Sequence, residues 1–307
     1  MDNPITGYSY DREDRNALQP FNAFISDLDD TLLNEDHRLT DRTAETLRRI
    51  QRQGVRVILA SGRMAASMRP IVLQAGTTAP YIACNGAEIV DGETHRVLYA
   101  ERIPLALAKE ALDWLEAEGV YAQIYYGDDW YYDKPGEIAD SYSRSSGVQG
   151  TQVSRLSAFA HGPTPKLLGI AEPERVQALI ISGRERFGQS LSLTTSQPYF
   201  LEITSPLATK GNAVRRLAEM IGLMPERTLI AGDSLNDLSM LEWTGTPITV
   251  ENARDEVRRI AWRIGGHAHR DGIAKLLDEI IPAVGISDEI PLSRDICEFA
   301  PKEASEC

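Results

Sequence analysis

Short apolar runs alternate with helical patterns near the start of the chain, and this alternation restricts the fold more than any other feature. Apolar residues predominate in Phe21–Leu28, 55–60 and 80–86, and the run at 55–60 is rich in β-branched residues. Amphipathic helical patterns lie between them, at 41–53 and 65–74. Strands joined through single helices by short links are typical of a parallel sheet, because a parallel pair needs a crossover connection.

The same alternation returns near the end of the chain, after a central segment of different character. The later strands are expected at 227–233, 246–250 and around Trp262, and the later helices at 210–222, 237–243 and 271–281. Between the two blocks, residues 89–204 contain runs that alternate polar with apolar residues, with helical stretches at 104–118 and 173–187. We therefore predict an α/β fold: a Rossmann-like, doubly wound parallel sheet interrupted by an inserted α+β domain.

The predicted division of the chain follows from these patterns. The α/β core comprises residues 21–88 and 205–285, and the inserted unit comprises 89–204. Residues 1–20 lack periodicity and are expected to form a loose arm, and residues 286–307 an irregular tail.

Composition excludes several classes of function. The formal net charge of -13 argues against a nucleic-acid partner, since phosphate backbones select clustered Lys and Arg. No apolar run approaches the roughly 20 residues that span a bilayer, and the N-terminus has no secretory leader, so we expect a cytoplasmic protein without a membrane partner. The three cysteines are too few for a disulfide framework and lack metal-ligand spacing.

Polar residues that suit phosphoryl transfer follow the predicted strands. Open parallel sheets build their sites at the carboxyl ends of the strands. The residues at these ends, or at the start of the next helix, are Asp27, Asp29, Ser61, Lys210, Asp233, Asn236 and Asp237. The carboxylates form an all-oxygen set that suits Mg²⁺. A carboxylate can also act as nucleophile, a second one as acid and base, and a hydroxyl and an ammonium can hold phosphoryl oxygens.

Four segments, in this order, resemble the motifs of the haloacid dehalogenase superfamily: DLDDTLL from Asp27, ASGR from Ala60, TKG from Thr209 and GDSLND from Gly232. Within that superfamily the chain is similar to the Cof-type sugar phosphatases, whose NGA pattern matches residues 85–87. The resemblance covers about residues 21–285. Asp30 stands where many members have glycine, and Ser61 where threonine is commoner, but neither change removes a required group.

The resemblance implies a role for each of these residues. Asp27 would be the nucleophile, and Asp29 the acid and base, whose backbone carbonyl also binds Mg²⁺. Asp233 would bind the metal directly and Asp237 through water. The implied contacts to a small phosphorylated substrate come from Ser61, Gly62, Asn85, Gly86, Lys210 and Asn236. The long interval from Ser61 to Lys210 leaves room for the inserted unit, which the resemblance identifies as a C2-type cap that selects the substrate.

Alternatives stay open at this point. A phosphotransferase or mutase would use the same residues with a sugar hydroxyl as acceptor, and a receiver-type switch also combines aspartate, serine, lysine and Mg²⁺. Asp29 and the inserted unit argue against the switch. Arg63 either reaches the substrate or pairs with a nearby carboxylate. The aromatic residues at 125–126 and 130–132 either contact the substrate or form cap core, and we expect replacement of Tyr125 or Trp130 to alter specificity. His267 and His269 lack further metal ligands nearby in the sequence.

Overall fold

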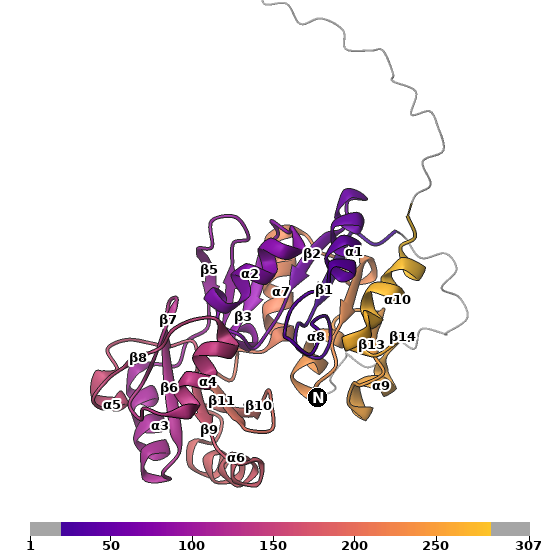
Figure 1. Cartoon of the computed structure of the whole chain (residues 1–307). Helices are drawn as coiled ribbons and strands as arrows, with labels where there is room; N and C mark the ends of the chain where they lie inside the picture. Colours follow the sequence, from indigo (N-terminus) through magenta and orange to yellow (C-terminus); the bar gives the residue numbers. More distant parts are fainter. Residues whose placement is uncertain (1–19, 284–307) are drawn as a thin grey trace, which may run out of the picture.

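The computed structural model describes residues 20–283, which form two units that lie side by side (Figure 1). The predicted arm, except for Pro20, and the whole of the predicted tail, residues 286–307, lie outside this range. A five-stranded sheet, entirely parallel, forms the first unit in the order β14-β13-β12-β1-β2. Its strands are β1 (Ala23–Ser26), β2 (Arg56–Leu59), β12 (Thr228–Ala231), β13 (Pro247–Val250) and β14 (Arg263–Gly265).

Helices cover this sheet as the crossover connections require. They are α1 (Asp41–Arg52), α2 (Ala65–Ala75), α7 (Lys210–Ile221), α8 (Leu238–Leu241), α9 (Asp255–Ile260) and α10 (Gly272–Ile280), with short 3₁₀ turns at Pro225–Arg227, Leu235–Asp237 and Ala268–Arg270. The start of α1 is fixed by Thr40, whose hydroxyl accepts a hydrogen bond from the Thr43 amide over 3.0 Å. α1 packs against α2 and α10.

A small antiparallel sheet extends the core beyond β2. It consists of β3 (Tyr81–Ala83), β4 (Glu88–Val90) and β5 (Val97–Ala100), and a parallel bridge from Ala60 to Ile82 joins β3 to the end of β2. The 3₁₀ turn Cys84–Gly86 connects β3 to β4. The predicted start of the inserted unit at residue 89 is therefore too early, because β4 and β5 pair with β3 and not with the strands of the cap.

The cap is a six-stranded sheet in the order β10-β11-β9-β6-β7-β8, antiparallel except between β7 and β8. Its strands are β6 (Tyr121–Tyr126), β7 (Asp129–Tyr132), β8 (Thr151–Gln152), β9 (Leu167–Ile170), β10 (Ser192–Thr195) and β11 (Phe200–Thr204), and its helices are α3 (Leu105–Ala117), α4 (Glu137–Ser146), α5 (Leu156–Phe159) and α6 (Pro173–Phe187). α3 and α6 lie on the side of this sheet away from the core (Figure 1).

Alternation along the cap strands separates their two faces. Ile124, Leu201 and Ile203 pack with α3 and α6 in one apolar cluster. Tyr125 and Leu168, which point the other way, belong instead to the cluster that contains the core sheet. One face of the cap sheet is thus directed toward the α/β core.

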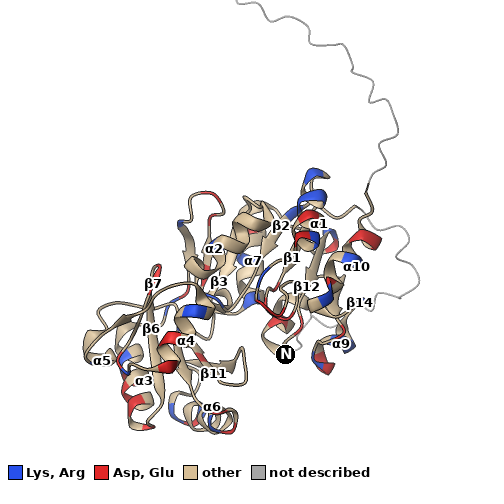
Figure 2. Ribbon diagram, viewed as in Figure 1, with Lys and Arg blue, Asp and Glu red and all other residues tan. Residues whose placement is uncertain are grey.

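Charged residues of both signs are interspersed over the two units in the view of Figure 2. Among the described residues, no helix combines the length and apolar character that a membrane span requires.

Candidate active site

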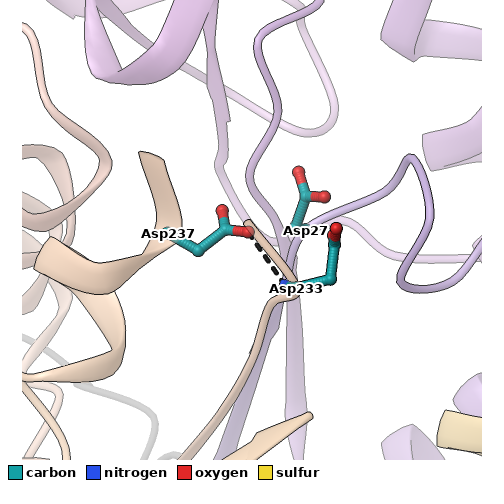
Figure 3. A group of neighbouring side chains, drawn as sticks. All are labelled: Asp27, Asp233 and Asp237. Atoms are coloured by element: carbon teal, nitrogen blue, oxygen red, sulfur yellow. Dashed lines mark hydrogen bonds between the residues drawn. The ribbon is translucent and has the colours of Figure 1, made fainter. Parts of the chain in front are cut away.

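Three carboxylates converge where β1 and β12 end. Asp27 directly follows β1, Asp233 lies two residues after β12, and Asp237 ends the 3₁₀ turn that comes next. Each offers an oxygen atom within 4.8 Å of the others, and Figure 3 shows the three side chains gathered beside the strand ends. Because β1 leads to β2 on one side while β12 lies on the other, this is the switch point at which open parallel sheets bind ligands.

The carboxylate of Asp237 is held by the backbone of the same loop. Its Oδ2 accepts a hydrogen bond of 3.0 Å from the Asp233 amide, which Figure 3 shows, and another of 3.0 Å from the Ser234 amide. Gly232 makes this approach possible, since a Cβ atom there would lie 2.6 Å from the Cβ of Asp237. Asp233 is oriented from the first motif, because Thr31 donates to its Oδ1 over 2.7 Å.

Lys210 lies beneath the carboxylates as the first residue of α7. Thr209 caps this helix by accepting a hydrogen bond from the Asn212 amide. The Lys210 ammonium donates to Asp27 Oδ1 over 2.5 Å and to Asp237 Oδ1 over 2.6 Å, and its side chain is fully buried. Burial by itself lowers the pKa of Lys210, but Asp237 and Asp27 outweigh it and raise the pKa above the ordinary value.

One ammonium does not neutralise three neighbouring carboxylates. Burial, together with the negative charge of Asp237, raises the pKa of Asp233 to about 7. Burial also raises the pKa of Asp27, and the other carboxylates add to the rise despite the opposing effect of Lys210. Crowded, desolvated oxygen ligands of this kind are suited to a hard divalent cation, so these residues fit the predicted metal.

Asp29 lies outside the three-carboxylate group and forms an ion pair. Arg63 donates to both of its oxygens, over 2.8 and 2.6 Å, and His37 Nδ1 lies 3.0 Å from Oδ1. Burial alone raises the pKa of Asp29, but the hydrogen bonds from Arg63 and His37 hold it well below its usual range. Of the two predictions for Arg63, the structure shows the pairing with a carboxylate. The metal contact predicted for Asp29 uses its backbone carbonyl and does not conflict with this pair.

Ser61 and Gly62 continue the chain beyond β2 and line the cavity beside Asp27. The Ser61 hydroxyl oxygen accepts a hydrogen bond from the Arg63 amide over 3.2 Å, which leaves its own proton free to donate. Asn236 also lines the cavity, and its side chain donates to Asn85 Oδ1 over 3.0 Å.

Asn85 and Gly86 lie in the layer beneath the cavity wall. Neither lines the cavity. Asn85 lies behind Gly62, and Gly86 packs so closely on the start of α7 that a Cβ atom would lie 2.2 Å from the Thr209 carbonyl oxygen. The backbone here is left-handed at Cys84, Asn85 and Gly86. The geometry therefore gives these residues a supporting role for Asn236 and Lys210, and their contact with the substrate stays a prediction.

A cavity of about 730 Å³ lies above the carboxylates, between core and cap. The cap contributes residues that the sequence patterns did not single out, among them Tyr142, Lys166 and Glu202. The sequence does carry a signal for two of them: Lys166 immediately precedes the apolar strand β9, and Glu202 is the charged residue within the strand β11. Tyr125 and Trp130 are completely buried in the cluster that contains the core sheet and do not line the cavity, so the structure gives no direct contact through which they would set specificity.

Comparison with known proteins identifies the family. A family model described as haloacid dehalogenase-like hydrolase matches residues 24–277. The chain belongs to this family. It is 30% identical to the phosphatase YwpJ of Bacillus subtilis, over 83% of this chain and 98% of that protein. It is 26% identical to the pyridoxal phosphate phosphatase YbhA of Escherichia coli, over 82% and 95% of the two chains.

A solved structure agrees with this assignment. The crystal structure of TM0651 from Thermotoga maritima matches with a TM-score of 0.75 and 31% identity, over 84% of this chain and 97% of that one. The haloacid dehalogenase-like hydrolase fold, with a parallel core sheet and a separate cap sheet, is confirmed. The predicted class of enzyme, a phosphoric monoester hydrolase, is confirmed as well, and the receiver-type alternative is excluded.

Proposed function

We propose that the protein is a Mg²⁺-dependent phosphatase that cleaves small phosphate monoesters through a phospho-aspartate on Asp27. The observation that supports this most strongly is the meeting of Asp27, Asp233 and Asp237 around the buried ammonium of Lys210. A structural ion pair needs one carboxylate for one ammonium. The surplus of buried negative charge favours binding of a metal cation, and these carboxylates lie at the base of a cavity large enough for a metabolite.

The metal would be held by Asp27 and Asp233 directly, with Asp237 acting through water and Asp29 through its backbone carbonyl. When bound, Mg²⁺ neutralises charge on the phosphoryl oxygens and keeps the group aligned for attack. The chain itself supplies the remaining interactions.

Asp27 attacks phosphorus, so that an Asp27 oxygen–phosphorus bond forms as the ester oxygen–phosphorus bond breaks. Lys210 holds Asp27 in place through the 2.5 Å hydrogen bond and balances the charge that moves onto the phosphoryl oxygens. Ser61, whose hydroxyl proton is free, donates to one of those oxygens. Water then attacks phosphorus of the acyl phosphate, and the Asp27 oxygen–phosphorus bond breaks. Inorganic phosphate is released, and the carboxylate of Asp27 is restored.

Asp29 supplies the proton for the leaving oxygen and later accepts one from water. In the structure it is held as an ionised carboxylate by Arg63 and His37. We therefore expect Asp29 to release Arg63 and take up a proton from solvent when the ester binds, and to donate that proton to the leaving oxygen as the ester bond breaks.

The substrate we propose is a small phosphorylated metabolite such as a sugar phosphate. The cap side of the cavity presents hydroxyl, amide and aromatic groups from Tyr142, Thr195, Ser196, Gln197 and Phe200. Such groups suit a polar, compact leaving group. A relative named as a pyridoxal phosphate phosphatase supports small phosphate monoesters as the general class of substrate. The cap would then select among such esters.

A panel of hexose, pentose and triose phosphates, nucleotides and pyridoxal phosphate, assayed for phosphate release with Mg²⁺, tests this proposal. We expect release from at least one class, and loss of that release in chelator and in Asp27→Asn. Turnover that persists in excess chelator would contradict the metal requirement. Conversion of a phosphosugar to a positional isomer without free phosphate would identify a mutase instead.

A further inference from the structure

A buried lysine of the cap contacts the backbone of the core beside Ser61. Lys166 lies immediately before β9, and its ammonium donates to the carbonyl oxygen of Gly62 over 3.0 Å. The same ammonium lies 3.1 Å from Glu202 Oε2 and 3.4 Å from Oε1. Glu202 belongs to β11, on the face of the cap sheet that is directed toward the core. The ammonium thus joins one carboxylate of the cap to one carbonyl of the core.

This contact is built into the cap and is not an incidental meeting of surface groups. Lys166 and Glu202 are each only 2% exposed. Ser196 holds Glu202 by donating to its Oε1 over 2.9 Å, and the ring of Tyr125 lies 4.9 Å from the ammonium. A buried ion pair gains little stability over apolar side chains of similar size, so its presence is better explained by a specific geometric task.

A single peptide group connects the contact between Lys166 and Gly62 to the hydroxyl of Ser61. The Gly62 carbonyl and the Arg63 amide belong to the same planar, trans peptide unit, so they point in opposite directions. Lys166 draws the carbonyl toward the cap, and the amide of Arg63 is accordingly directed at Ser61 Oγ, 3.2 Å away. If that peptide rotated, the Ser61 hydroxyl would lose the donor that orients it.

We infer that Lys166 is a positioning residue that, through the Gly62–Arg63 peptide, fixes the hydroxyl of Ser61 for phosphoryl binding. Docking of the cap thereby completes the phosphoryl-binding loop in the core. This inference rests on the proposed function, because it assigns the oxygens of a phosphate group to Ser61.

Inorganic phosphate is the appropriate probe, since it has no leaving group for the cap to contact. Its affinity is measured by calorimetry with Mg²⁺ on the full chain. Two variants are compared: Lys166→Met/Glu202→Gln and Lys166→Gln/Glu202→Gln. Both remove the buried charges and retain an amide for Ser196, but only the second keeps a hydrogen-bond donor at position 166. Lys134→Met is the control, because Lys134 donates to the Val120 carbonyl within the cap.

We expect Lys166→Met/Glu202→Gln to bind phosphate roughly tenfold more weakly than the wild type, the effect of one orienting hydrogen bond. The value of kcat/KM should fall by a similar factor for every ester tested. Lys166→Gln/Glu202→Gln should recover most of the affinity, and Lys134→Met should bind as the wild type does. Melting temperatures identify any loss of fold, and Lys166→Leu/Glu202→Leu replaces the methionine variant if that variant does not fold.

Equal phosphate affinity in the folded Met and Gln variants would overturn the inference. Unchanged phosphate affinity with losses that depend on the leaving group would also overturn it, and would make Lys166 a direct substrate contact. The proposed function fails separately, if the wild type itself neither binds phosphate nor hydrolyses any ester.

Discussion

Arg63 donates two hydrogen bonds to the carboxylate of Asp29, from Nε over 2.8 Å and from Nη2 over 2.6 Å. Asp29 is the proposed acid and base, and its pair with Arg63 favours the ionised form of the carboxylate. The pair also shows why Arg63 lines the cavity without being free to bind an anion there.

Replacing Arg63 with methionine should shift the pH profile. Loss of the guanidinium favours the protonated form of Asp29 and raises its pKa. The limb of kcat/KM that falls as Asp29 ionises should therefore move to higher pH. Arg69→Met is the control, because Arg69 pairs with Asp128 away from the catalytic carboxylates. A limb that stays in place, or moves to lower pH, would contradict the acid role of Asp29.

Lys210→Met should destabilise the metal-free protein. The change leaves buried carboxylates without their cation, and breaking a buried pair in this way costs about 3–5 kcal/mol. Denaturant unfolding in chelator measures the loss, with Lys275→Met as control because Lys275 is exposed and donates to the Arg270 carbonyl. Unfolding midpoints that are the same for Lys210→Met and the control would show that Lys210 does not balance this charge.

Magnesium should stabilise the protein more at high pH than at low pH. The pKa of Asp233 is raised to about 7, so the folded, metal-free protein holds this proton more tightly than the unfolded chain does. The stability of the metal-free protein is therefore higher at low pH and is lost as pH rises through about 7. Mg²⁺ binds the ionised carboxylates and competes with protons. The Mg²⁺-induced rise in Tm should therefore be larger above about pH 8 than below about pH 6. A rise that is independent of pH would place the metal elsewhere.

Trp130 and Tyr142 should respond differently to substitution. Trp130 is fully buried and donates to the Val148 carbonyl, so Trp130→Ala should lower the free energy of unfolding by about 3–5 kcal/mol. Tyr142 lines the cavity, and Tyr142→Phe should alter the ratio of kcat/KM between esters with little change in Tm. A change of ester preference in folded Trp130→Ala, and none in Tyr142→Phe, would reverse this assignment.

The sequence predicted those parts of the site that depend on local pattern. Asp27 and Ser61 follow apolar strands, and Lys210 opens a helix, so strand and helix boundaries place them with little further information. Asp27, Asp233 and Asp237 lie close together in the structure, because parallel strands present their carboxyl ends at one edge of the sheet.

Features that depend on pairing between distant segments were not predictable. An antiparallel strand has the same alternation whether it pairs with the core or with the cap, and β4 and β5 were therefore assigned to the wrong unit. The Lys166–Glu202 pair requires β9 and β11 to be neighbours, which no local pattern reveals. The burial of Tyr125 likewise depends on the core against which the cap sheet packs.

Trapping the phospho-aspartate tests the central claim most directly. Asp29→Asn should slow hydrolysis of the intermediate, while an ester with a good leaving group needs no proton in the first step. Acid quench during turnover, followed by peptide mass measurement, should find one phosphoryl group on Asp27, and none in Asp27→Asn/Asp29→Asn. Turnover by Asp29→Asn without any such adduct, or with the group on another residue such as Ser61, would contradict the account.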